Sequence, residues 1–192
     1  MLSDNKFFNF IKPFLNYIDE GNLYKKPFGW LYIIIAVINL LIPLFIIIRL
    51  INVGLFNGPF KEVLVIILVW LSITFAGWIS FQIWWDRKST VLGIGSERDE
   101  FVATPVFAHF IKTLGESMGT WVAIVGFLLA LMTTIILGGE GTSISRELGI
   151  EFLGSGAIFI ILSPVIGFLI IVLFKFISEL ISALSAIANN TK

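Results

Sequence analysis

Four long stretches of this chain contain no Lys, Arg, Asp, Glu or His, and they cover residues 29–48, 63–85, 118–137 and 155–174. A helix needs roughly 20 apolar residues to cross about 30 Å of hydrocarbon, so each stretch is long enough for one crossing. In hydrocarbon every backbone N–H and C=O must be satisfied within the segment, which an α-helix achieves. The sequence therefore predicts an all-α integral membrane protein with four transmembrane helices.

The composition excludes several other classes of protein. Hydrophobic residues make up 57% of the chain and charged residues 14%, whereas a typical soluble domain is about 45–50% apolar and about 25% charged. A water-soluble fold of 192 residues could not bury so much apolar surface. We therefore exclude a soluble enzyme, a disordered chain and a protein that binds nucleic acid.

The positions of the positive charges predict how the chain is threaded. Both terminal tails and the segment between the second and third stretches share one side of the membrane, and they hold ten of the 13 Lys and Arg residues. Segments rich in Lys and Arg stay in the cytoplasm, so both termini are expected to be cytoplasmic. The frequent Ile, Phe, Asn and Lys suggest a low-GC bacterial genome, so the expected location is a bacterial inner membrane. Tryptophans near the cytoplasmic boundary are expected to anchor the helices among lipid headgroups: Trp30, Trp84, Trp85 and Trp121.

The four stretches divide the chain into five segments. Residues 1–28 form a cytoplasmic tail, 29–85 a first transmembrane hairpin and 86–117 a cytoplasmic loop. Residues 118–174 form a second hairpin, and 175–192 form a cytoplasmic helical tail. Short outer loops leave no room for a receptor domain.

Two cytoplasmic segments have the pattern of amphipathic helices. Residues 7–18 place phenylalanines and isoleucines at helical spacing, although Pro13 disfavours one unbroken helix. Residues 104–117 begin with a Thr-Pro helix start and continue with a similar apolar face that leads into the third stretch. We expect both helices to lie in the membrane interface on the cytoplasmic side. The alternative for the first is a short helix that packs on the protein's own loop.

The third stretch carries the clearest signal for helix packing. Small residues share one face of this helix and allow a neighbouring backbone to approach closely. We expect it to pack on the fourth stretch, where small residues also share a face, and we expect the larger side chains opposite to meet lipid or a partner. The small residues are Gly115, Gly119, Ala123, Gly126 and Ala130 before and in the third stretch, and Gly156, Ser163 and Gly167 in the fourth.

Asn39 is the most polar residue near the middle of a stretch, and Pro43 follows it by one helical turn. An amide in lipid needs a hydrogen-bond partner, so the Asn39 side chain is expected to point inward. It is interpreted as an interhelical contact, because a ligand site needs several convergent polar groups. A ligand contact or gate is the alternative.

Reactive chemistry is not visible in this sequence. The chain has no Cys and a single His, which excludes thiolate and multi-histidine metal sites. The four stretches lack the ionisable residues of a proton or ion relay, and no phosphate-loop or hydrolase motif occurs. His109 is expected to be solvated or to touch headgroups, and the acidic cluster of Glu97, Asp99 and Glu100 is read as a solvated turn. No catalytic, cofactor-binding or metal-binding residue is therefore predicted.

These features favour a non-enzymatic protein that acts as an accessory or scaffold subunit of a larger membrane complex. Its expected partners are membrane lipids and other membrane protein subunits. Two alternatives remain open. The first is a small transporter or channel for an uncharged or lipid-like solute, with a polar path lined by Asn39, Thr74, Thr133, Thr134 and Ser163. The second is a protein that binds lipid through the phenylalanines near residues 7–14 and 107–110.

Overall fold

The computed structural model describes residues 6–19, 22–94, 103–138, 146 and 156–190. Every regular element in these residues is a helix. The elements are α1 (Lys6–Asp19), α2 (Asn22–Asn52), the short 3-10 helix η1 (Leu55–Asn57), α3 (Phe60–Leu92), α4 (Ala103–Leu137) and α6 (Ile158–Asn190).

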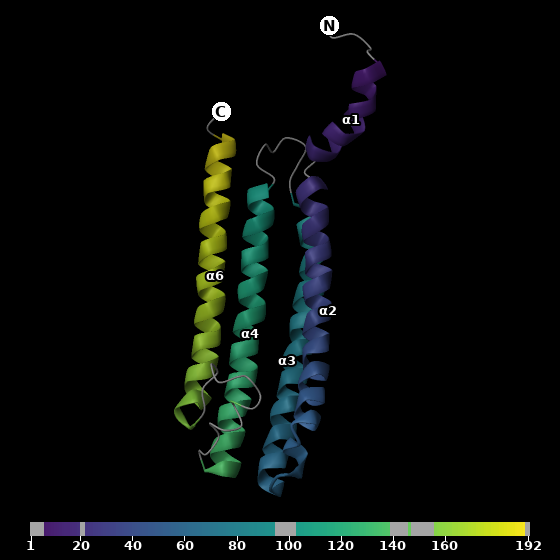
Figure 1. Cartoon of the computed structure of the whole chain (residues 1–192). Helices are drawn as coiled ribbons and strands as arrows, with labels where there is room; N and C mark the ends of the chain where they lie inside the picture. The colour runs from purple at the N-terminus through teal and green to yellow at the C-terminus, as the bar shows by residue number, and fades with distance from the viewer. Residues whose placement is uncertain (1–5, 20–21, 95–102, 139–145, 147–155, 191–192) are drawn as a thin grey trace.

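Four of the described helices, α2, α3, α4 and α6, are long and apolar enough to cross a membrane. Each contains all or nearly all of one uncharged stretch and runs beyond it, to a length of 31–35 residues. At about 1.5 Å per residue, such helices are roughly 46–52 Å long and exceed the hydrocarbon thickness of about 30 Å. Most of the extra turns lie at the end of the bundle where both termini lie, which we call the terminal end (Figure 1).

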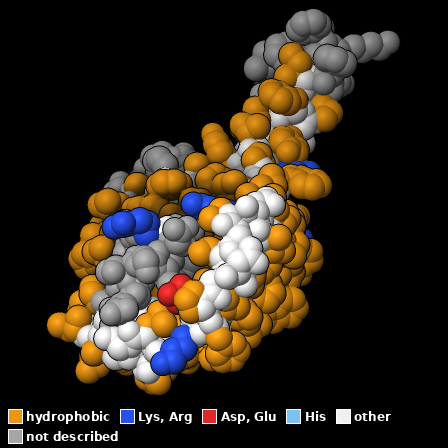
Figure 2. All heavy atoms as spheres, turned by 60° about the horizontal axis from the view of Figure 1, so that its bottom comes forward, with side chains coloured by type: hydrophobic (Ala, Val, Ile, Leu, Met, Phe, Trp, Pro, Cys, Tyr) orange, Lys and Arg blue, Asp and Glu red, His pale blue; other side chains and the backbone are white. Residues whose placement is uncertain are grey.

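The long helices pack as a row of antiparallel neighbours (Figure 1). The α2 helix packs along α3, α3 along α4, and α4 along α6, whereas α2 touches α4 only slightly. No described helix other than α4 makes extensive contact with α6. Hydrophobic side chains therefore cover much of the outer surface, and Figure 2 shows this surface around the end opposite the termini.

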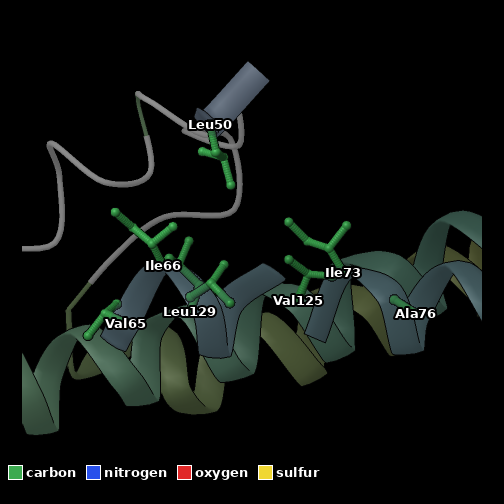
Figure 3. Packing of buried hydrophobic residues seen from close by; sticks show 8 residues of the cluster. Leu50, Val65, Ile66, Ile73, Ala76, Val125 and Leu129 are labelled. Atoms are coloured by element: carbon green, nitrogen blue, oxygen red, sulfur yellow. The ribbon is translucent and has the colours of Figure 1, made fainter. Parts of the chain in front are cut away.

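The larger of two buried clusters joins three helices in the half of the bundle away from the terminal end. Figure 3 shows Val125 and Leu129 of α4 beside the α3 side chains, with Leu50 of α2 above them. Val125 and Leu129 belong to the larger side chains that were expected to meet lipid or a partner, and this expectation is wrong for both, because they are fully buried against α3 of the same chain. The cluster consists of Leu50, Val65, Ile66, Val69, Ile73, Ala76, Val125 and Leu129.

Residues 103–117 differ from the surface-lying helix expected there. They form the first turns of α4, which continues without interruption through the third stretch. Val106, Phe110 and Leu114 pack into the second buried cluster, together with Tyr32 of α2 and Trp84 of α3. The apolar face of this segment therefore covers neighbouring helices, and α4 continues without a break past Gly115 and Gly119 at the start of the third stretch.

The N-terminal helix α1 runs through Pro13 without a break, contrary to the expectation from that residue. It contacts α2 and extends away from the four-helix row (Figure 1). The Phe14 side chain is exposed. The Phe14 side chain therefore does not pack into the described part of the bundle.

Candidate functional site

Polar side chains from three helices meet near the terminal end, and we call Tyr32, Arg87, His109, Thr113 and Glu116 the polar cluster. Arg87 of α3 donates from Nε to Glu116 Oε2 at 3.1 Å and from Nη2 to Oε1 at 3.2 Å. This two-pronged geometry is the stronger form of an arginine–carboxylate pair. It joins the end of α3 to the part of α4 that precedes the third stretch.

Tyr32 of α2 is fully buried at the centre of the polar cluster. Its hydroxyl donates to Thr113 Oγ1 at 3.1 Å and lies 2.9 Å from His109 Nδ1, with which it shares a second hydrogen bond. Its ring packs edge-on against Trp84 at 4.9 Å between centroids. A buried tyrosine needs a partner for its hydroxyl, and here α4 provides two.

His109 is thus more enclosed than the solvated residue expected from the sequence. It lies in the part of α4 that precedes the uncharged stretch 118–137. Burial lowers the pKa of His109, and the positive charges of Lys112 and Arg87 add to this shift. The neutral imidazole is therefore favoured at neutral pH, as a hydrogen-bond partner for Tyr32.

The polar cluster is suited to holding α2, α3 and α4 at a fixed register. Catalysis would need a nucleophile activated by an oriented base, whereas Tyr32, His109 and Thr113 satisfy one another. Among the described residues no group of three His, Cys, Asp or Glu side chains could hold a metal ion. The cluster Glu97, Asp99 and Glu100 lies outside the described residues.

The small residues of the third and fourth stretches lie along a close seam between α4 and α6. A Cβ added to Gly119 would lie 2.5 Å from the Gly167 carbonyl oxygen, and one added to Gly167 would lie 2.7 Å from the Ala123 Cβ. Gly115 lies directly under the Phe174 side chain. Gly126, Ala130 and Ser163 are also buried.

Gly156 does not share this packing. It precedes α6 with a φ of 97°, and an added Cβ would meet no atom within 4 Å. Its positive φ, which side chains disfavour, gives the glycine a role in the turn. The expected packing role of Gly156 is therefore not what the structure has, because α6 begins at Ile158.

Asn39 joins α2 to α4 through its side chain. Its Oδ1 accepts a hydrogen bond from Trp121 Nε1 at 2.9 Å, and its Nδ2 donates to the Ile35 carbonyl at 2.8 Å. Both halves of the amide are therefore satisfied within the protein. This geometry agrees with an interhelical contact between α2 and α4.

We expect Asn39→Leu to destabilise the fold by leaving the Trp121 N–H without its acceptor. A double-mutant cycle with Trp121→Phe should give a coupling of about 0.6–1.7 kcal/mol, the range of interhelical hydrogen bonds in membranes. Unfolding of the four proteins in detergent, followed by circular dichroism, measures this term. Strictly additive losses would contradict the contact.

The four expected tryptophan anchors have different environments. Trp30 and Trp85 are exposed at the terminal end. Trp121 donates its N–H to Asn39, and Trp84 is fully buried in the second cluster. The prediction that Trp84 anchors its helix among lipid headgroups is therefore wrong, because residues 103–117 of α4 cover the ring.

Two features of the site were missed in the sequence. Gly77 permits the close approach of α2 and α3, since an added Cβ would lie 2.6 Å from the Asn39 carbonyl oxygen. The Arg87–Glu116 pair could have been anticipated, because Arg87 follows the second stretch and Glu116 precedes the third, at the same end of both. Gly77 gave no comparable signal, because it is a single glycine within the second stretch.

Comparisons of the chain with known proteins found no relative. No protein-family model, no curated protein and no solved structure matches this chain.

Proposed function

We propose that the four long helices cross a bacterial inner membrane, with both termini in the cytoplasm. Two observations support this topology. The helices are long and apolar, and the terminal end carries most of the Lys and Arg residues. Asymmetry of positive charge of this kind sets the orientation of membrane proteins. The exposed rings of Trp30 and Trp85 at the terminal end suit the headgroup layer.

Within that membrane, we propose a non-enzymatic scaffold subunit that holds another membrane protein through α6. One observation carries this proposal: α6 has a continuous apolar face opposite α4 that runs past the end of the uncharged stretch. Beyond Lys175, the exposed side chains of Phe176, Leu180 and Leu184 extend this face by successive helical turns. We call these three residues the α6 stripe.

Lipid tails cannot cover all of the α6 stripe. About 20 residues of α6 fill the hydrocarbon layer, so the turns after residue 174 reach the headgroups and beyond. Leu184 is 67% exposed there. An apolar helix of a partner subunit, continuing the contact from the membrane into the cytoplasm, is the occupant that matches this stripe.

The polar residues considered for a transport path support packing instead. Thr74 donates to the Trp70 carbonyl of its own helix, and Thr133 to the Leu129 carbonyl. Asn39 is satisfied between α2 and α4, whereas Ser163 lies on the other side of α4, at the α6 seam. Thr134 and Ser163 differ from these three residues, because their hydroxyls are buried without a hydrogen-bond partner in the described structure.

The test is purification of the full chain from its native membranes in a mild detergent. We expect one membrane protein to co-purify in a fixed ratio, and we expect Leu184→Glu to abolish this association. Ala186→Glu is the matched control, because it adds the same charge at an exposed position off the stripe. Isolation of the wild-type chain as a lone monomer, or equal loss with both variants, would refute the scaffold proposal.

A further inference from the structure

A groove with a basic lining opens between α4 and α6 at the terminal end, separate from the α6 stripe. It has a volume of about 320 Å³. Its polar lining comes from His109 and Lys112 of α4 and from Lys175, Ser178, Glu179 and Ser182 of α6. Ile94 and Pro105 complete the lining with apolar surface.

The charges in the groove favour an anion. Arg87 pairs with both carboxylate oxygens of Glu116, so Lys112 is only a distant partner of that carboxylate, at 4.0 Å. Lys175 lies 3.9 Å from Glu179. Both separations exceed hydrogen-bonding distance, so both ammonium groups keep donors for another acceptor. Among the lining residues that the structure describes, two lysines stand against the single carboxylate of Glu179, which gives a net positive charge.

The groove begins at the level of the headgroup layer of the proposed membrane. The α4 and α6 helices are in close contact where Phe174 covers Gly115, at the end of the uncharged stretch. The groove begins at the next residue, Lys175. On α6 the groove runs from Lys175 to Ser182, about 10 Å of helix, so it spans a headgroup layer roughly 5–7 Å thick and continues into the cytoplasm.

We propose that this groove binds a phosphate group, held by Lys112 and Lys175. Basic pockets between helices on the cytoplasmic side suit phosphate-bearing lipid headgroups. A soluble phosphate compound has the same chemistry and would use the same two lysines. This site does not depend on the scaffold role, because its residues lie off the α6 stripe.

The experiment compares two sources of phosphate with one purified full-length protein. Native mass spectrometry measures retention of dioleoylphosphatidylglycerol, and dioleoylglycerol tests an equivalent lipid without phosphate. The line width of inorganic phosphate in ³¹P NMR measures the soluble source. Retention of the phospholipid but not of dioleoylglycerol supports a headgroup site, and binding of inorganic phosphate alone supports a site for a soluble compound.

Variants decide whether the groove is responsible. We expect the double variant Lys112→Gln/Lys175→Gln to lower the affinity at least about tenfold, since each lysine near an anionic surface contributes about one factor of five. Glu179→Gln removes the opposing carboxylate and should raise the affinity. Arg49→Gln/Lys61→Gln removes two positive charges at the opposite end and should change nothing.

Folding of each variant is checked by circular dichroism, because solvent-accessible i,i+4 pairs of this kind contribute little to stability. Three results would overturn the proposal. The first is that the wild-type chain binds neither source. The second is that both double variants lose affinity equally. The third is that dioleoylglycerol is retained as well as the phospholipid.

Discussion

Gly119→Leu should separate α4 from α6 and lower the stability of the bundle. Even the first added atom, the Cβ, would lie 2.5 Å from the Gly167 carbonyl oxygen and from Ile171 Cγ1. The carbonyl oxygen belongs to a backbone and cannot rotate away, so the two helices must move apart. We expect a loss of about 3 kcal/mol, at the upper end of the usual cost of overpacking. This corresponds to a fall of roughly 6–12 °C in Tm for a chain of this length.

Thermal unfolding in detergent, followed by far-UV circular dichroism, measures the effect. Ala183→Leu is the matched control, because it adds a similar volume at an exposed position of α6. Its Tm should stay within about 2 °C of the wild type, as is usual for surface substitutions. If Gly119→Leu unfolds at the wild-type temperature, the close approach of α4 and α6 is wrong.

The sequence predicted the long helices well because each crossing is specified by a local property. An uncharged stretch of about 20 residues carries its own evidence, whatever its neighbours are. The seam between α4 and α6 was also accessible, since Gly119 and Ala123 lie on one face of one helix and Gly167 marks the matching face. Local periodicity was sufficient in both cases.

The environment of the terminal end could not be predicted in the same way. An amphipathic pattern at residues 104–117 shows that one face avoids water, but lipid and protein can both provide cover. The structure covers this face with Tyr32 and Trp84, which lie far away in the sequence. The same ambiguity explains Trp84, because a tryptophan near the end of an apolar stretch is typical of the interface and also of a buried contact.

Asn39 illustrates the limit for polar residues. Its inward direction followed from the cost of an unsatisfied amide in lipid. Its partner did not, because Trp121 was assigned to the headgroup layer and lies on a helix from the second hairpin. Pairings of this kind depend on how the helices are arranged, and the sequence of one chain does not specify that arrangement.

Trp84→Ala should cost about 3–5 kcal/mol, the usual loss when a large buried aromatic side chain is removed. Trp84 has no exposed surface, and its ring contacts Tyr32 and Phe110 at centroid distances of 4.9 and 5.6 Å. Trp85→Ala is the control at the adjacent position, where half of the side chain is exposed. We expect less than about 1 kcal/mol for that change, since little protein contact is lost.

Trp84→Phe separates a buried packing role from an interfacial anchor. The Trp84 Nε1 is buried without a hydrogen-bond partner in the described structure, so phenylalanine removes an unsatisfied donor while keeping an aromatic ring in the cluster. The smaller ring leaves a cavity, and the two effects oppose each other. We expect this variant to lose less than about half the stability lost by Trp84→Ala. If Trp84 were instead an anchor that depends on its N–H among the headgroups, Trp84→Phe and Trp84→Ala would lose similar stability, and Trp85→Ala would lose as much as both. Unfolding measurements on the three variants distinguish these outcomes.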